Sequence, residues 1–325
     1  MKLRRGFTII ELLVVMSIIL LLASLLIPSL VEAQNRARYV KWQAYSRFLQ
    51  SEPALRTYYE FDHQSGDEIG KTGGGCPPAG CLEVKNSAVG DPFAAATEKF
   101  DKWNNNGLGF IPTRTDSTGT SGWTTRKARW FGKSGLMFDS TDGTDDYVAL
   151  HQFYGANEAG EFTIAAWVNI ENNGVIGSFD HDQGAAELRL GGKVQWHTNA
   201  EGSAPDQQDS YLGSGNVKDG QWHLLAGTYS AEANEKRIWI DGHEQSDSTT
   251  VADVHLVGGK PAALGTSSVR YGFLGARSNA TRFNDPVPTG NFMKGAMDEF
   301  MVFHRALDTD EMINMFRAGV PTRRE

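Results

Sequence analysis

The most constraining feature of this sequence is a stretch near the N-terminus, from Leu12 to Val31, that contains no charged residue. About 20 predominantly apolar residues make a helix long enough to cross the hydrocarbon core of a bilayer. A secretory signal peptide would carry its small cleavage residue after such a run, whereas here Gly6 lies before it. Cleavage after Gly6 would therefore leave the apolar helix on the mature protein.

One carboxylate, Glu11, lies at the start of the apolar run. A charged side chain inside a membrane segment costs about 2.5–3.5 kcal/mol near the helix centre, so such residues usually have a partner. After cleavage at Gly6, the new α-amine of Phe7 would lie about one helical turn from Glu11. In a bundle of identical helices this amine can pair with Glu11 of a neighbouring subunit. The alternative is a signal anchor with an incidental glutamate.

The segment from Gly6 to Leu12 resembles the prepilin signature of type IV pilins and type II secretion pseudopilins. The resemblance implies cleavage after Gly6 by a prepilin peptidase, N-methylation of Phe7 and assembly of the helix with other pilin or pseudopilin subunits. Pro28 falls where many family members have a proline that kinks the helix. The implied location is the bacterial inner membrane, with a single pass and the head outside the cytoplasm, and then a periplasmic or cell-surface filament.

The expected organisation is a leader (1–6), one long helix (7–52, with its transmembrane half at about 7–31) and a head (53–325). The second half of the helix has an apolar face, which we expect to pack on the head. This face contains Tyr39, Trp42, Tyr45 and either Phe48 or Leu49.

The head is expected to be mainly β, because short runs of β-forming residues alternate with glycine turns. The expected strands are 54–63, 136–138, 147–150, 162–170, 175–179, 187–190, 193–197, 222–229, 236–240, 273–275 and 296–303. This spacing favours an antiparallel sandwich of two sheets. A short C-terminal helix should follow Asp308, which with Glu311 forms a capping-box pattern.

The same order of segments resembles laminin-G-like domains of the concanavalin-A-like jelly-roll class. The segments that carry the resemblance are 135–139, 146–148, 162–168, 220–223, 238–242, 295–300 and 305–312. The resemblance implies a domain that binds glycans or proteins, often with calcium.

A loop-rich insertion is expected at about 64–130. It contains both cysteines, Cys76 and Cys81. Outside the cytoplasm these are expected to form a small disulfide loop. Their spacing does not fit a thioredoxin-type pair, and no further soft ligand is suitably placed for a zinc site.

An acidic loop gives the head a candidate cation site. No cofactor is required for the predicted function, but calcium prefers six to eight oxygen ligands, and such a loop can supply several. The alternative is a solvated acidic hairpin loop. The candidate ligands are Asp139, Asp142, Asp145, Asp146 and, from a later strand, Asp298.

Three tryptophans in the loop-rich region are candidates for an exposed ligand platform, namely Trp103, Trp123 and Trp130. Trp167, Trp222 and Trp239 lie in strand patterns and are expected in the core, whereas Trp196 and His197 are candidates to line a concave sheet face.

Catalysis is not expected. Glycosidases need two carboxylates that face one sugar, and the neighbouring acids Asp298 and Glu299 should point to opposite faces of a strand. Nucleic acid is not an expected partner either. The net charge is −8, and removal of Lys2, Arg4 and Arg5 with the leader makes it more negative still.

The sequence thus predicts a pilin-like filament subunit whose head binds a glycan or surface polymer. Because the head is large, it would crowd a filament made of this subunit alone, which favours a minor subunit. One alternative is a pseudopilin of a type II secretion system, whose head contacts a secreted protein or other pseudopilins. A second alternative is a membrane-anchored lectin that never polymerises and would tolerate Glu11→Leu.

Overall fold

The structure is a computed structural model of the 325-residue chain. It describes residues 8–61, 81–84, 109–112, 122–124, 128–130, 133, 135–138, 147–153, 161–179, 186–198, 209–212, 216–230, 232–233, 235–245, 256–257, 260–261, 270–277 and 290–321.

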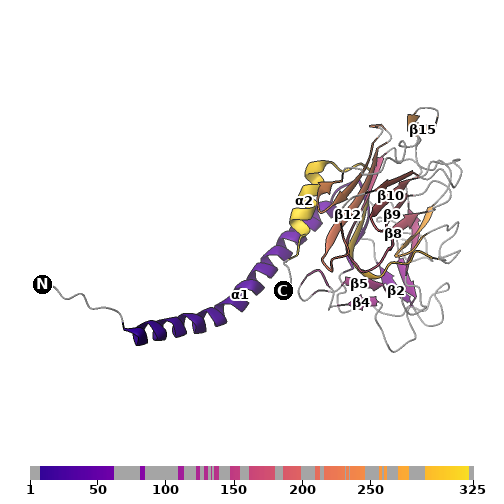
Figure 1. The fold of residues 1–325 in the computed structure, drawn as a ribbon. Helices are drawn as coiled ribbons and strands as arrows, with labels where there is room; N and C mark the ends of the chain where they lie inside the picture. The colour runs from indigo at the N-terminus through magenta and orange to yellow at the C-terminus, as the bar shows by residue number, and fades with distance from the viewer. Residues whose placement is uncertain are drawn as a thin grey trace.

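A single long helix, α1 (Ile9–Gln50), extends away from a β-rich head (Figure 1). Thr8 caps it, and the side chains of Thr8 and Glu11 form a capping box. The helix continues through Pro28, and Figure 1 shows that its two halves point in different directions, as expected where a proline removes a backbone donor. By length and composition α1 could cross a membrane, and none of its most apolar part is buried.

The first sheet has the order β14-β13-β12-β7-β18-β5-β4, and β1 pairs with the far end of β18. Its strands are β1 (Leu55–Tyr59), β4 (Gly122–Thr124), β5 (Gly135–Phe138), β7 (Glu161–Ile170), β12 (His223–Ser230), β13 (Glu235–Ile240), β14 (His243–Glu244) and β18 (Gly295–Phe303).

The second sheet has the order β11-β10-β9-β8-β17-β6-β3-β2. Its strands are β2 (Cys81–Val84), β3 (Gly109–Pro112), β6 (Val148–Phe153), β8 (Gly174–Phe179), β9 (Ala186–Leu190), β10 (Val194–Thr198), β11 (Asp209–Leu212) and β17 (Arg270–Leu274). A small ribbon of β15 (Leu256–Val257) and β16 (Lys260–Pro261) stands apart, and α2 (Thr309–Gly319) follows β18.

The first sheet is buried on both faces, which explains its nearly continuous apolar strands. Along β7, Ile164, Ala166 and Val168 face the second sheet and form part of the sandwich core. Ala165 and Trp167 alternate with them and face α1 and α2, because successive side chains of a strand point to opposite faces. The head therefore has three layers, with the two helices packed on the outside of the first sheet.

The expected fold is confirmed: the structure has a long apolar N-terminal helix, an antiparallel two-sheet sandwich and a short C-terminal helix. The start of α2 is also as expected, since Asp308 caps it and forms a capping box with Glu311. The strands expected between residues 136 and 303 all occur, with ends that differ by a few residues. The differences that matter lie where α1 meets the first sheet.

Candidate functional site

The second half of α1 packs on the outer face of the first sheet. Trp42 is 2% exposed and its ring meets Trp130 and Trp167 at centroid distances of 6.5 and 6.4 Å. Leu49 is also buried, whereas Phe48 is 62% exposed. The expected contact face of the helix is therefore confirmed, and its last apolar position is Leu49.

A buried arginine, Arg129, holds this junction together. Its Nε atom lies 2.8 Å from Oδ2 of Asp298, and its Nη2 atom lies 2.7 Å from Oε2 of Glu299. Its Nη1 atom donates to the carbonyl of Gly319 at 3.2 Å. One guanidinium thus joins β18 to the end of α2. It donates a hydrogen bond to Asp298, whereas its contact with Glu299 is an ion pair without hydrogen-bond geometry.

The Arg129 guanidinium also lies over three tryptophan rings. Its Cζ atom is 4.5 Å from the ring centroids of Trp42 and Trp167 and 4.8 Å from that of Trp130. Desolvated cation–π contacts of this kind are each worth about 2 kcal/mol. Because Trp42 belongs to α1, the arginine links the helix to the head as well as to α2.

A β-bulge in β18 brings both acids to this arginine. The register between β18 and β7 shifts between Asp298 and Phe300, and Glu299 has a φ of +58°. The extra residue breaks the strict alternation of a strand, so Asp298 and Glu299 turn toward the same face. The expectation that these neighbouring acids point to opposite faces was therefore wrong.

The carboxyl of Glu299 has a pKa well above its ordinary value. Burial raises the pKa of its carboxyl, and the nearby charge of Asp298 adds to that rise, while Arg129 and the indole N–H of Trp42 oppose it. Arg129 supplies one positive charge to two buried carboxyl groups. The raised pKa of Glu299 favours its protonated, neutral form, which reduces the net negative charge of the junction.

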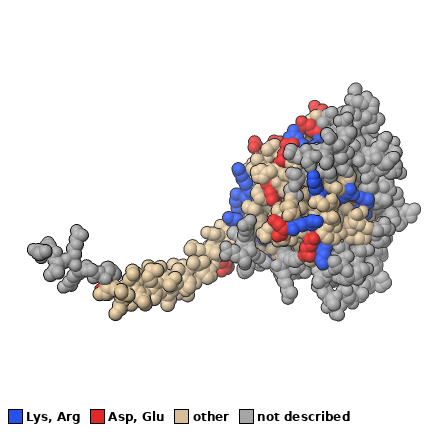
Figure 2. Space-filling model, in the orientation of Figure 1, with Lys and Arg blue, Asp and Glu red and all other residues tan. Residues whose placement is uncertain are grey.

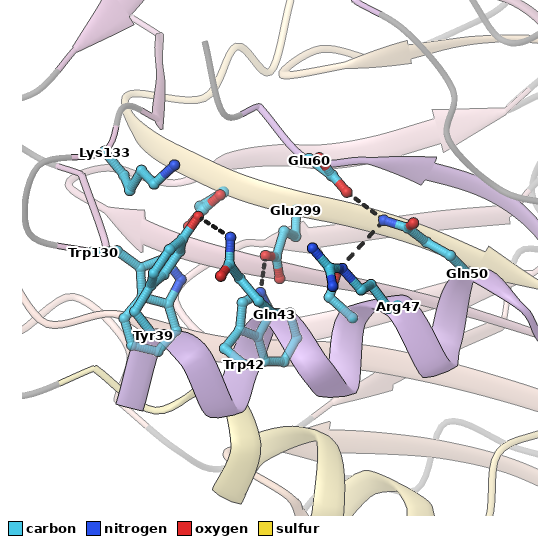
Figure 3. Close-up of a pocket in the computed structure, with 11 residues that line it drawn as sticks. Tyr39, Trp42, Gln43, Arg47, Gln50, Glu60, Trp130, Lys133 and Glu299 are labelled. Carbon is cyan, nitrogen blue, oxygen red and sulfur yellow. Dashed lines mark hydrogen bonds between the residues drawn. The ribbon is translucent and has the colours of Figure 1, made fainter. Parts of the chain in front are cut away.

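A pocket of about 180 Å³ opens between α1 and β18 (Figure 3). At one end Gln43 donates to the hydroxyl of Tyr39 at 2.9 Å, and Lys133 lies 4.9 Å from the centroid of that ring. At the other end Gln50 donates to Glu60. Figure 3 shows Glu299 between these two ends, opposite Trp42. The pocket is thus a polar seam that runs along the helix.

Basic residues of α1 complete the contact with α2. Arg38 donates to the carbonyl of Pro321 at 3.4 Å, and Lys41 donates to that of Arg317 at 3.3 Å. Cations at a helix C-terminus complement its orphan carbonyls and its dipole. Figure 2 shows Lys and Arg atoms on the head next to the place where the helix leaves it, while most of the protruding part is without charge.

The N-terminal end of α1 carries the other predicted site. The carboxylate of Glu11 accepts from the backbone N–H and the hydroxyl of Thr8, both at 2.8 Å. Gly6 and Phe7 lie outside the described residues, so cleavage and methylation stay predictions.

A family model described as the concanavalin A-like lectin/glucanases superfamily matches residues 142–312, which is more than half of the chain. The chain belongs to this superfamily. A second family model, the prokaryotic N-terminal methylation motif, matches residues 1–27 of this lectin-superfamily member. The two matches fall on the head and on the apolar part of α1, so the suspected fusion is confirmed.

Solved structures with a similar fold include the binding domain of Paraclostridial Mosquitocidal Protein 1, with 10% identity and a TM-score of 0.47 over 81% of this chain. This lectin-superfamily member spans about half of that protein's length, 52%. A native heptameric SAP-like pentraxin from Limulus polyphemus has 12% identity and a TM-score of 0.40, covering 55% of this chain and 78% of its own. Domains LG4-5 of the mouse laminin alpha1 chain have 18% identity and a TM-score of 0.36, covering 51% and 41%. No curated protein matches.

Two of the residues predicted for sites in the lectin-like head have other roles. Trp130 was expected on an exposed platform but is 5% exposed, because it packs against Trp42 and Arg129. Asp298 was expected to bind calcium, but it is buried and its carboxylate pairs with Arg129. Within the part of the chain that the structure describes, no group of three or more His, Cys, Asp or Glu residues could hold a metal ion.

The remaining predicted site residues of the head are not described in full. Cys81 begins β2 and Trp123 lies in β4, with no description of their side chains. The others lie outside the described residues, namely Cys76, Trp103, Asp139, Asp142, Asp145 and Asp146. The disulfide and the calcium loop therefore stay predictions. Sequence reasoning missed Arg129, which follows the Ser/Thr/Gly-rich stretch 113–125 and has no periodic pattern around it.

Proposed function

We propose that this chain is a minor subunit of a pilin-type filament and that its head binds a glycan on a surface or polymer. A pilin-type signature and a lectin-superfamily head in one chain support a pilin-type subunit with a binding domain. The minor role and the glycan are the steps that this proposal adds.

The observation that carries the proposal is the buried contact between the head and the second half of its own helix. Trp42, Arg129 and Glu299 form buried contacts between the helix and the head. The apolar part of α1 makes no such contact, is exposed, and points away from the head (Figure 1). An exposed apolar helix needs a bilayer or other helices around it. A head fixed to that helix would then be held at a set angle on the outside of an assembly.

The proposed pathway begins in the bacterial inner membrane, with the head outside the cytoplasm. A prepilin peptidase cleaves after Gly6, and the new N-terminus at Phe7 is methylated. Glu11 then pairs with the α-amine of a neighbouring subunit as the helix leaves the membrane for the filament. A membrane carboxylate without such a partner would be costly.

We propose that the head binds its ligand without cleaving it. The acids Asp298 and Glu299, which share one strand, are both buried beneath α1 and paired with Arg129. They are therefore unable to flank a sugar in the way that glycosidase carboxylates do.

Replacement of Glu11 tests the assembly step. Glu11→Leu should abolish the subunit in sheared filaments while the full chain still fractionates with the membrane. The matched control is Glu32→Leu, on the same helix, where the carboxylate bonds Arg36 at 2.6 Å outside the charge-free run. Filaments that incorporate Glu11→Leu normally would refute the assembly role and favour a lectin that never polymerises.

A glycan panel tests the head. The full chain in detergent micelles is applied to neutral and acidic glycans, with calcium and with a chelator. Binding supports the lectin role, and its loss on chelation would assign the acidic loop to the ligand site. A folded protein that binds none of the glycans would contradict the lectin role and favour a type II secretion pseudopilin whose head contacts proteins.

A further inference from the structure

The outer face of the second sheet carries a connected group of polar side chains. Strands β9 and β10 send Leu188 and Trp196 into the sandwich core. The side chains that alternate with them face outward. Register places Glu187 opposite Ser178 on one side and His197 on the other, and it places Arg189 opposite Gln195.

Glu187 is the centre of this group and is fully buried. Its carboxylate accepts from Ser178 Oγ at 3.1 Å and from Nε and Nη2 of Arg277 at 3.2 Å each. Arg189 adds a third charged contact, from Nη1 at 3.3 Å. A buried carboxylate is tolerated when it is paired in this way. Two arginines on one acid leave the group with a surplus positive charge.

The two guanidinium groups reach the surface at their outer edges. The side chains of Arg189 and Arg277 are 24% and 26% exposed, although the carboxylate that they share is not exposed at all. Arg189 is held further by Gln195, which accepts from its Nε atom at 2.5 Å. Within the described part of the chain, Nη2 of Arg189 and Nη1 of Arg277 make no hydrogen bond. These donors remain available to a ligand.

An apolar cluster borders the two arginines. Phe273 pairs with Ser178 in register, which places it beside the polar group, and its ring meets Tyr147 edge-on at 5.1 Å. Phe292 packs against the same cluster and is only partly buried. Tyr147 and Phe273 are themselves buried, so Phe292 is the member of this cluster that is partly exposed. A partly exposed ring near charged donors can contact the apolar face of a sugar ring, whose substituents are polar.

We propose that this outer face of the second sheet binds an acidic glycan, whose carboxylate is taken by Arg189 and Arg277. Guanidinium groups bind carboxylates through paired, charge-assisted hydrogen bonds. Glu187 acts as a positioning residue, because it holds both guanidinium groups without reaching the ligand. The proposal rests on the proposed glycan-binding function and adds the place and the class of sugar.

The test compares an acidic oligosaccharide with its neutral counterpart. The full chain in detergent micelles is titrated with trigalacturonic acid and with galactotriose. We expect binding of the acidic sugar only, and a weaker affinity at higher salt because the guanidinium edges are exposed. Arg277→Gln and Arg189→Gln should each weaken that binding at least tenfold.

Arg237 provides the matched control. It lies on β13 of the first sheet, is 34% exposed and pairs with Glu235 and Glu244. Arg237→Gln removes a comparable surface arginine and should leave binding unchanged. Arg277→Lys guards against misfolding, since a lysine keeps the ion pair with Glu187 but loses the fork, and it should also weaken binding.

The outcomes separate this inference from the function on which it rests. Binding of both sugars with equal affinity, or binding of the acidic sugar that the arginine variants do not weaken, overturns the inference and leaves a lectin that binds elsewhere. If neither trigalacturonic acid nor any other acidic glycan of the panel binds, the inference alone is overturned when a neutral glycan binds, and the lectin role is overturned as well when none does.

Discussion

The indole of Trp42 donates a hydrogen bond to the carboxylate of Glu299, although 257 positions separate the two residues. The donor belongs to the helix that would anchor the chain, and the acceptor belongs to the bulge of strand β18, next to the middle strand β7. The contact thus ties the anchor to the middle of the head.

Loss of Arg129 should destabilise the head strongly. Arg129→Met leaves two buried carboxylates without their cation, and removing one partner of a buried ion pair typically costs about 3–5 kcal/mol. The measurement is the free energy of unfolding in denaturant, with the full chain in micelles. Arg237→Met, at an exposed pair, should cost less than about 1 kcal/mol.

A combined variant separates lost charge from lost packing. Adding Asp298→Asn and Glu299→Gln to Arg129→Met removes the unpaired charges, so part of the stability should return. A triple variant no more stable than Arg129→Met would show that the arginine acts through packing alone.

Truncation of Trp42 should destabilise the protein far more than truncation of Phe48, although both residues lie on the same helix. Trp42→Ala empties a buried site among Trp130, Trp167 and Arg129 and should cost about 3–5 kcal/mol. Phe48 is largely exposed, so Phe48→Ala should change the free energy of unfolding by less than about 0.5 kcal/mol. Similar losses for the two variants would contradict the observed seat of the helix.

Gly319, the last residue of α2, allows a close approach between elements. A Cβ atom there would lie 2.6 Å from the ring of Trp167 and 2.7 Å from that of Trp42. Gly319→Ala should therefore cost about 1–3 kcal/mol through overpacking, despite the better helix propensity of alanine. At Gly290 a Cβ would meet nothing within 4 Å, so Gly290→Ala is the control, and thermal unfolding compares the two.

His223 gives the head a pH-dependent contribution to stability. Its Nδ1 atom lies 2.8 Å from Asp241 and its Nε2 atom 3.0 Å from Asp219. Burial alone would lower the pKa of His223, but the two carboxylates outweigh it and raise the pKa. The folded state then holds the proton more tightly than the unfolded state does.

The contribution of His223 is therefore complete below the unfolded pKa of about 6.5 and is lost as the pH rises through the folded pKa. We expect His223→Gln to destabilise the protein more at pH 5.5 than at pH 9, as measured by denaturant unfolding. Asp219→Asn, which leaves His223 in place, should make the free energy of unfolding depend less on pH. A destabilisation by His223→Gln that is the same at both pH values would contradict this account.

The periodic parts of the structure could be predicted from the sequence. Residues 162–170 alternate large β-forming side chains, and they form β7 in the middle of the first sheet. Asp308 and Glu311 lie three residues apart before an apolar face, and they cap α2. In each case the signal is local, so neighbouring residues suffice to specify the element.

The junction could not be predicted, because its signals are not local. Strict alternation of side chains along the strand would place Asp298 and Glu299 on opposite faces. The bulge that turns both toward the same face is visible only in the pairing of β18 with β7. Trp130 was assigned from the composition around it, although its partners lie on α1. Arg129 contacts groups in α1, β18 and α2, and no short window of sequence contains them together.

The position of Trp42 also sets an order of events during synthesis. The helix leaves the ribosome first, but the groups that cover Trp42 come from Arg129, Glu299 and Gly319. Until the residues through Gly319 have been translated, the side chain of Trp42 lacks the groups that bury it in the folded protein. A chain that ends before Glu299 would therefore carry the apolar helix with the aromatic face around Trp42 uncovered.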